Sequence, residues 1–181
     1  MTNDVAKFAL IVSQKVAEQA EGLWRPSSEA QPSKHEGVLP ASVFKGSKAY
    51  IEKIVFQING SYASSCFDAC AVMLRRLLET LIIEAFERHE VSDQIKDSNG
   101  SFVKLGEMID KTLVCSTWNL SRNTKRDIKK LKDIGDLSAH NRYYMANRTD
   151  IDNARESFRV VTQELLLIAD SAPSHHSNNK G

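Results

Sequence analysis

Apolar residues recur every three or four positions along most of the chain, the spacing that places them on one face of an α-helix. This pattern predicts six helices, over about residues 4–23, 41–58, 62–89, 102–113, 123–135 and 151–169. No window alternates convincingly between apolar and polar residues, so we expect no strands; Val114-Cys115 is the nearest exception. The 62–89 segment is the longest and is expected to be the central helix.

The side chains expected to face the core lie on these apolar stripes. In the second and third segments they are Phe44, Ile51, Ile54, Val55, Ile58, Cys66, Cys70, Met73, Leu74, Leu77, Leu78, Leu81, Ile82, Ala85 and Phe86. In the last three they are Leu105, Met108, Ile109, Leu113, Ile128, Leu131, Ile134, Phe158, Val161, Leu165, Ile168 and Ala169.

Short polar segments separate the predicted helices. Asn59-Gly60 is typical of a helix end, Gly135 is expected to bend or end the fifth helix, and Asp150 is expected to cap the last one. Residues 25–40 are rich in Ser, Pro, Glu and Lys and are expected to form a flexible loop, and 171–181 a disordered tail. We therefore expect an all-α, up-and-down bundle of five to six helices that forms one domain over residues 1–170.

Composition narrows the class of protein. The 181 residues are 41% hydrophobic and 26% charged, as in ordinary globular domains. No segment is typical of a signal peptide or a membrane span, and three cysteines are an odd count for a disulfide framework, so we expect a cytoplasmic protein without membrane contact. Cys66 and Cys70 are predicted to be buried thiols rather than half of a metal site, and we expect no cofactor and no metal.

Charge is unevenly distributed along a chain whose net charge is only +1. Residues 120–148 contain eight Lys or Arg and three acids. Six of the cations belong to the predicted fifth helix: Arg122, Lys125, Arg126, Lys129, Lys130 and Lys132. They could follow a nucleic-acid backbone, or they could be an ordinary solvated helix face; Trp118, Tyr143 and Tyr144 flank them.

A second concentration of polar residues lies at 135–142, Gly-Asp-Leu-Ser-Ala-His-Asn-Arg. Asp136 and His140 are four residues apart and would share a helix face, where a carboxylate could orient the imidazole for proton transfer. The structural alternative, which spacing alone favours, is that His140 caps or bridges helix ends while Asp136 pairs with a lysine. Arg75, Arg76 and Glu79 on the central helix could likewise reach a neighbouring helix or form a simple ion pair.

Two segments together carry a resemblance to a known family. Residues 71–79, Ala-Val-Met-Leu-Arg-Arg-Leu-Leu-Glu, and residues 131–142, Leu-Lys-Asp-Ile-Gly-Asp-Leu-Ser-Ala-His-Asn-Arg, resemble a bacterial domain-of-unknown-function family of the HEPN superfamily, also found fused to restriction-modification subunits. The resemblance covers residues 41–169. It implies a helical bundle, usually a homodimer, with polar motifs in a cleft at the dimer interface.

Many HEPN proteins are metal-independent endoribonucleases of toxin–antitoxin and phage-defence systems, with a motif of arginine, a polar residue and, a few residues later, histidine. Asp136 and His140 match the last two positions, but Gly135 stands where the arginine would be. The resemblance therefore implies a catalytic group in which Arg142 or Arg76 supplies the cation. The catalytic candidates are His140, Asp136, Arg142, Arg76 and Glu79, and the nucleic-acid-binding candidates are Arg122, Lys125, Arg126, Lys129, Lys132 and Asn141.

The expected function is that of a HEPN-like domain of prokaryotic defence or toxin–antitoxin systems, acting on or binding RNA through a polar cleft around His140. Expected partners are a second copy of the chain, RNA or a nucleotide, and a cognate antitoxin or restriction-system protein. The alternative is a non-catalytic nucleotide-binding or protein-interaction module with a degenerate motif.

Overall fold

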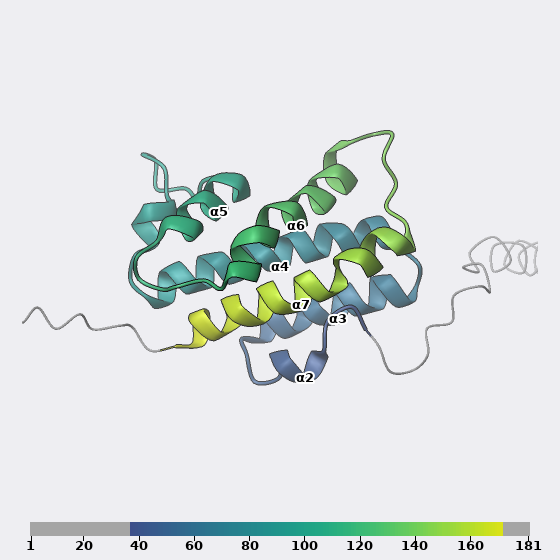
Figure 1. The fold of residues 1–181 in the computed structure, drawn as a ribbon, viewed down its shortest axis with the longest axis horizontal. Helices are drawn as coiled ribbons and strands as arrows, with labels where there is room; N and C mark the ends of the chain where they lie inside the picture. Colours follow the sequence, from purple (N-terminus) through teal and green to yellow (C-terminus); the bar gives the residue numbers. More distant parts are fainter. Residues whose placement is uncertain (1–36, 172–181) are drawn as a thin grey trace, which may run out of the picture. The chain divides into compact units, whose positions relative to one another are not determined.

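The computed structural model describes residues 37–171, and these residues form an all-α bundle (Figure 1). Its elements are α2 (Ala41–Phe44), α3 (Ala49–Ala63), α4 (Phe67–Arg88), the 3₁₀ turn η2 (Ser92–Ile95), α5 (Leu105–Val114), α6 (Arg122–His140) and α7 (Arg148–Asp170). Within this range strand-like pairing is limited to an isolated antiparallel bridge between Lys96 and Phe102. The predicted all-α class, with six α-helices in the described residues, is confirmed.

The α4 helix is the centre of the bundle, as the sequence predicts. It packs against α3, α5, α6 and α7, and Figure 1 shows the long helices running beside it. Its side chains Leu74, Leu77, Leu78, Leu81 and Ile82 are fully buried. Burying an aliphatic side chain stabilises a fold by about 1.5–3 kcal/mol, so this stripe is the main apolar contribution to the core.

The predicted stop at Asn59-Gly60 is wrong, because α3 continues through both residues to Ala63. The chain turns instead at Ser64-Ser65-Cys66, where Ser65 adopts a positive φ of 58°. Cys66 therefore lies in the turn and is exposed, which corrects the prediction of two buried thiols; Cys70 is buried as expected. Burial raises the pKa of the Cys70 thiol to about 12, so it is a core side chain rather than a nucleophile.

Other helix boundaries also differ from those predicted. The last helix begins at Arg148, and its cap is Asn147, which forms a capping box with Asp150. Gly135 does not end its helix, which runs on to His140. Gly46, with a positive φ of 89°, separates α2 from α3, where one continuous helix was expected.

Part of the predicted 25–40 loop is packed against the bundle. Val38 and Leu39 are buried, and Asn59 exchanges hydrogen bonds with both the N–H and the C=O of Leu39. The predicted helix at 4–23, the loop residues 25–36 and the tail from 172 onward lie outside the described residues, so the single domain over 1–170 stays a prediction. Among residues 37–171 no helix is both long and apolar enough to cross a membrane.

Candidate functional site: a polar hollow at the end of α6

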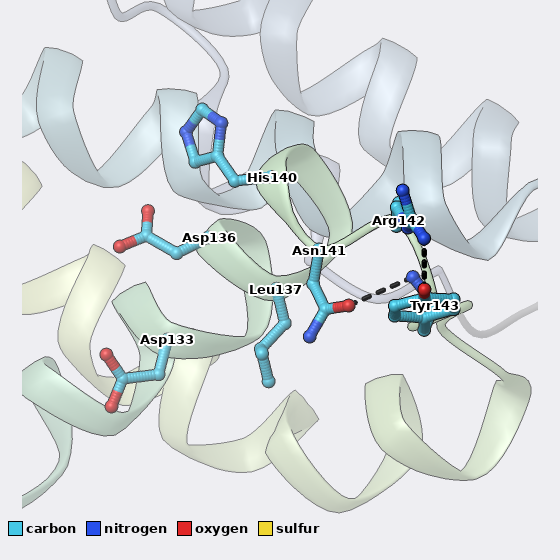
Figure 2. Close-up of a pocket in the computed structure, with 7 residues that line it drawn as sticks. All are labelled: Asp133, Asp136, Leu137, His140, Asn141, Arg142 and Tyr143. Atoms are coloured by element: carbon cyan, nitrogen blue, oxygen red, sulfur yellow. Dashed lines mark hydrogen bonds between the residues drawn. The ribbon is translucent and has the colours of Figure 1, made fainter.

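The polar cluster of the sequence forms an open hollow of about 600 Å³ where α6 ends (Figure 2). Its walls come from the last two turns of α6 and from the loop that follows. The lining residues are Asp133, Asp136, Leu137, His140, Asn141, Arg142 and Tyr143. The last four are all exposed, and the volume lies within the range of ordinary small-ligand sites.

The α6 helix is fixed to the bundle at its beginning by a polar cap. Ser121 is the N-cap residue, and its side chain accepts from the Thr124 N–H. Glu164 of α7 in turn accepts from the backbone N–H and the hydroxyl of Ser121, at 2.6 and 2.7 Å. These bonds attach the N-terminus of α6 to α7 and so help to fix the orientation of α6, whose C-terminal end forms the hollow.

Gly135 lets α6 approach α4 closely near the hollow. A Cβ atom built on Gly135 would lie 2.4 Å from the Cβ of Arg75 and 3.0 Å from the carbonyl oxygen of Ala71. Since real Cβ atoms do not come that close to other heavy atoms, residue 135 has to be glycine for this helix crossing. The arginine of the HEPN motif therefore has no room at this position.

Asp136 is held by two cations from different helices. Its carboxylate accepts from Arg75 Nε of α4 at 2.5 Å and from Lys132 Nζ at 2.5 Å, and Arg75 also pairs with Glu79 at 3.4 Å. Partial burial alone would raise the pKa of Asp136, but the hydrogen bonds from Lys132 and Arg75 outweigh it and hold that pKa below its usual value. The same contact with Asp136 raises the pKa of Lys132. This network ties α6 to α4 beside the hollow.

His140 does not share this network. No hydrogen bond or ion pair between described residues joins it to Asp136, and Figure 2 draws no interaction between the two side chains. The structural alternative is thus confirmed for Asp136, which pairs with Lys132. His140 does not cap the helix; Asn141 is the C-cap residue, and its backbone N–H bonds to the Leu137 carbonyl. The imidazole stays exposed and open to a ligand.

The lowered pKa of Asp136 predicts a pH-dependent contribution to stability. The ion pairs are fully present above the unfolded-state pKa of about 4 and are lost as pH falls through the lower folded-state pKa. Asp136→Asn should therefore cost about 1 kcal/mol of unfolding free energy at pH 7, a small figure because the side chain is 32% exposed, and progressively less as the pH falls through the folded-state pKa.

Urea unfolding of both proteins at several pH values measures this difference. Wild type and variant will both lose stability in acid, because the pKa of Asp127, which accepts hydrogen bonds from Arg126, is also lowered. A destabilisation by Asp136→Asn that is equal at pH 7 and pH 2 would show that the carboxylate charge contributes nothing.

The structure separates the two remaining catalytic candidates from the hollow. Arg76 is exposed on α4 and lines a different hollow, between α3 and α4, together with Phe56 and Met73. Glu79 is partly exposed and pairs with Arg75 rather than with Arg76. Of the five residues proposed for catalysis, His140, Asp136 and Arg142 are brought together, and Arg76 and Glu79 are not.

The cations of α6 form an exposed face that leads toward the hollow. Arg122, Lys125, Arg126, Lys129 and Lys130 are all exposed. Arg126 pairs with Asp127 at 2.8 Å and Lys129 with Asp110 at 2.7 Å, whereas Lys125 Nζ donates to the amide oxygen of Asn119 and pairs with no acid among residues 37–171. Arg126 and Lys129 are 64% and 59% exposed, so these surface pairs are weak and their cations remain accessible to an anion.

Two residues beside the hollow were not among the predicted site residues. Arg75 acts through Asp136, 61 positions away in the sequence, a contact that only the folded chain reveals. Tyr143 was noted only as a flanking aromatic, yet it is 81% exposed, whereas Trp118 packs on Phe86 and Tyr144 is half-buried. The sequence signal that could have identified Tyr143 is its position directly after the polar cluster at 135–142.

Comparison of the chain with family models, with curated proteins and with solved structures finds no match. Within residues 37–171 no three His, Cys, Asp or Glu side chains converge in a way that could hold a metal ion. The arrangement offers an imidazole, a guanidinium, an amide and a phenol ring at one open site, next to a cationic helix face. Such groups can bind an anion and a flat polar ring.

Proposed function

We propose that this protein is a HEPN-like domain that binds single-stranded RNA along the exposed face of α6 and in the hollow at its end. The observation that carries the proposal is the continuity of these two surfaces. The spacing of four and three residues that joins Arg122, Arg126 and Lys129 continues through Asp133 and Asp136 to His140, so these residues share one helix face. The stretch from residue 122 to 140 is about 27 Å long at 1.5 Å per residue, enough for several nucleotides.

Phosphate binding explains why these cations are exposed and only weakly paired. An approaching phosphate can replace a surface partner such as Asp110 at little cost, and the release of condensed counterions favours the exchange. The face also contains two acids, Asp133 and Asp136, and both are already paired with Lys132. The charge distribution therefore favours a polyanion over an acidic or a neutral partner protein.

The geometry supports binding more strongly than cleavage. His140 could carry a proton and Arg142 lines the same hollow, but Asp136 is occupied by Arg75 and Lys132. Gly135 leaves no room for the motif arginine. Ribonuclease activity, the homodimer, membership of the HEPN superfamily and a cognate antitoxin or restriction-system partner remain predictions from the sequence resemblance.

Titration of ¹⁵N-labelled protein with a short single-stranded RNA, followed by amide chemical shifts, tests the location of binding. We expect the resonances of Arg126, Lys130, His140 and Tyr143 to move together and to saturate. The amide of Lys53, on α3, is the internal reference and should not move. Shifts centred on α3, or an unchanged spectrum at millimolar RNA, would contradict the proposal, and the second result would favour a protein-interaction module.

A further inference from the structure

The loop after α6 holds one aromatic ring out in solvent. Tyr143 is 81% exposed, although its neighbour Tyr144 is half-buried and donates to Asp150 at 3.1 Å. The backbone N–H of Tyr143 donates to Asn141 Oδ1 at 2.9 Å. Further along, the N–H of Ala146 donates to Asp68 on α4 at 2.9 Å. The loop is thus fixed on both sides of Tyr143, and the ring is presented without a large entropic cost on binding.

One face of that ring is already stacked. The Arg142 guanidinium lies 4.5 Å from the ring centroid, and it also donates a hydrogen bond to the phenol oxygen. Figure 2 shows the guanidinium over the ring and the Asn141 side chain beside it. Asn141 uses its oxygen for the Tyr143 N–H, and its Nδ2 group donates no hydrogen bond to any described residue. A flat ligand on Tyr143 would meet an amide donor at its edge.

The charges around the hollow indicate how a nucleotide would be oriented. Asp133 and Asp136 line the side formed by α6, and Tyr143 and Arg142 the side formed by the loop (Figure 2). The Asp133 carboxylate, whose side chain is 64% exposed, disfavours a phosphate beside it, whereas a neutral base can donate to it; the Asp136 carboxylate is already occupied by Arg75 and Lys132. The cations on the exposed face of α6 lie outside the hollow. The favourable arrangement therefore places a base inside and the phosphates outside.

We propose, building on the function proposed above, that Tyr143 is a stacking platform for one unpaired nucleobase, whose polar edge is contacted by Asn141. Stacking on an aromatic side chain does not depend on the identity of the base, so the platform is expected to prefer single strands over duplexes rather than one sequence over another. In this complex Arg142 contacts the face of the Tyr143 ring that is opposite to the base. Its charge then lies near the phosphate next to the stacked base.

The test uses a single-stranded RNA carrying one 2-aminopurine, whose fluorescence falls when it stacks. Binding by wild type, Tyr143→Ala, Tyr143→Phe and Met145→Ala is compared. Met145 is 78% exposed on the same loop and is the matched control. We expect Tyr143→Ala to lose the quenching and about 5- to 150-fold in affinity, while Tyr143→Phe and Met145→Ala stay within about 2-fold of wild type.

The outcomes separate the two proposals. If wild type and Tyr143→Ala bind with equal affinity and equal quenching, the platform is overturned while RNA binding stands. Equal losses in Tyr143→Ala and Met145→Ala would also overturn it, because they would indicate a general apolar contact. If wild type binds no RNA, the proposed function fails and the platform fails with it.

Discussion

Replacing Gly135 by arginine, which would complete the HEPN motif, is expected to destabilise the protein by more than about 4 kcal/mol rather than to create an active site. The reason is steric: even a Cβ atom would lie 2.4 Å from the Cβ of Arg75, so α6 would have to move away from α4. That movement would also break the bond between Arg75 and Asp136. Gly135→Ala, with the same Cβ and no further atoms, should cost about 1–3 kcal/mol.

Thermal and urea unfolding measure both variants, and Gly60→Ala is the matched control. Gly60 is also inside a helix, but a Cβ there would meet no atom within 4 Å. Alanine has the higher helix propensity, so Gly60→Ala should stabilise the protein by about 0.5–1 kcal/mol. If Gly135→Ala were as stable as wild type while Gly60→Ala behaved as expected, the close crossing of α4 and α6 would be incorrect.

Removing three cations from α6 is expected to weaken RNA binding by about 10- to 150-fold near 0.1 M salt. The variant carries Arg122→Gln, Lys125→Gln and Lys130→Gln. It leaves Lys129 in place, so that Asp110 keeps its partner. The estimate assumes about 0.5–1 kcal/mol for each phosphate contact. Binding of a labelled single-stranded RNA, followed by fluorescence anisotropy, gives the affinities.

The control removes the same amount of charge from other elements. Lys45, Lys53 and Lys104 are exposed, lie outside α6 and pair with no acid among the described residues. Their triple Gln variant should bind RNA within about 3-fold of wild type, because it loses only the long-range part of the attraction. If both triple variants lost the same affinity for RNA, binding would depend on the net charge of the protein and not on the α6 face.

The sequence predicts the helices well because the spacing of their apolar residues can be seen within each segment, without knowledge of its neighbours in the fold. Leu74, Leu78 and Ile82 were expected to be buried from their spacing alone, and they are. Helix ends were less predictable, because tertiary contacts override local preferences. The α3 helix continues beyond Asn59-Gly60 to Ala63 and includes Tyr62, whose ring is buried and whose hydroxyl donates to Asp152 of α7 at 2.5 Å.

The sequence predicts which polar residues of the candidate site lie close together, but not which of them pair with one another. His140, Asn141 and Arg142 line one hollow, as their proximity suggests. The partner of Asp136 could not be predicted, because i to i+4 spacing offers both His140 and Lys132, and the choice depends on Arg75 of another helix. Nor does composition distinguish a glycine that bends a helix from one that lets two helices touch, which is the role of Gly135.

The central claim, that the α6 face and the adjoining hollow bind RNA, is tested most directly by the salt dependence of the wild-type affinity. The logarithm of the binding constant for single-stranded RNA should fall linearly with the logarithm of salt concentration, with a slope of about −0.7 for each phosphate contacted. We expect the slope of the α6 triple variant to be shallower by about 2. An affinity that does not change with salt, or equal slopes in the two proteins, would contradict the account.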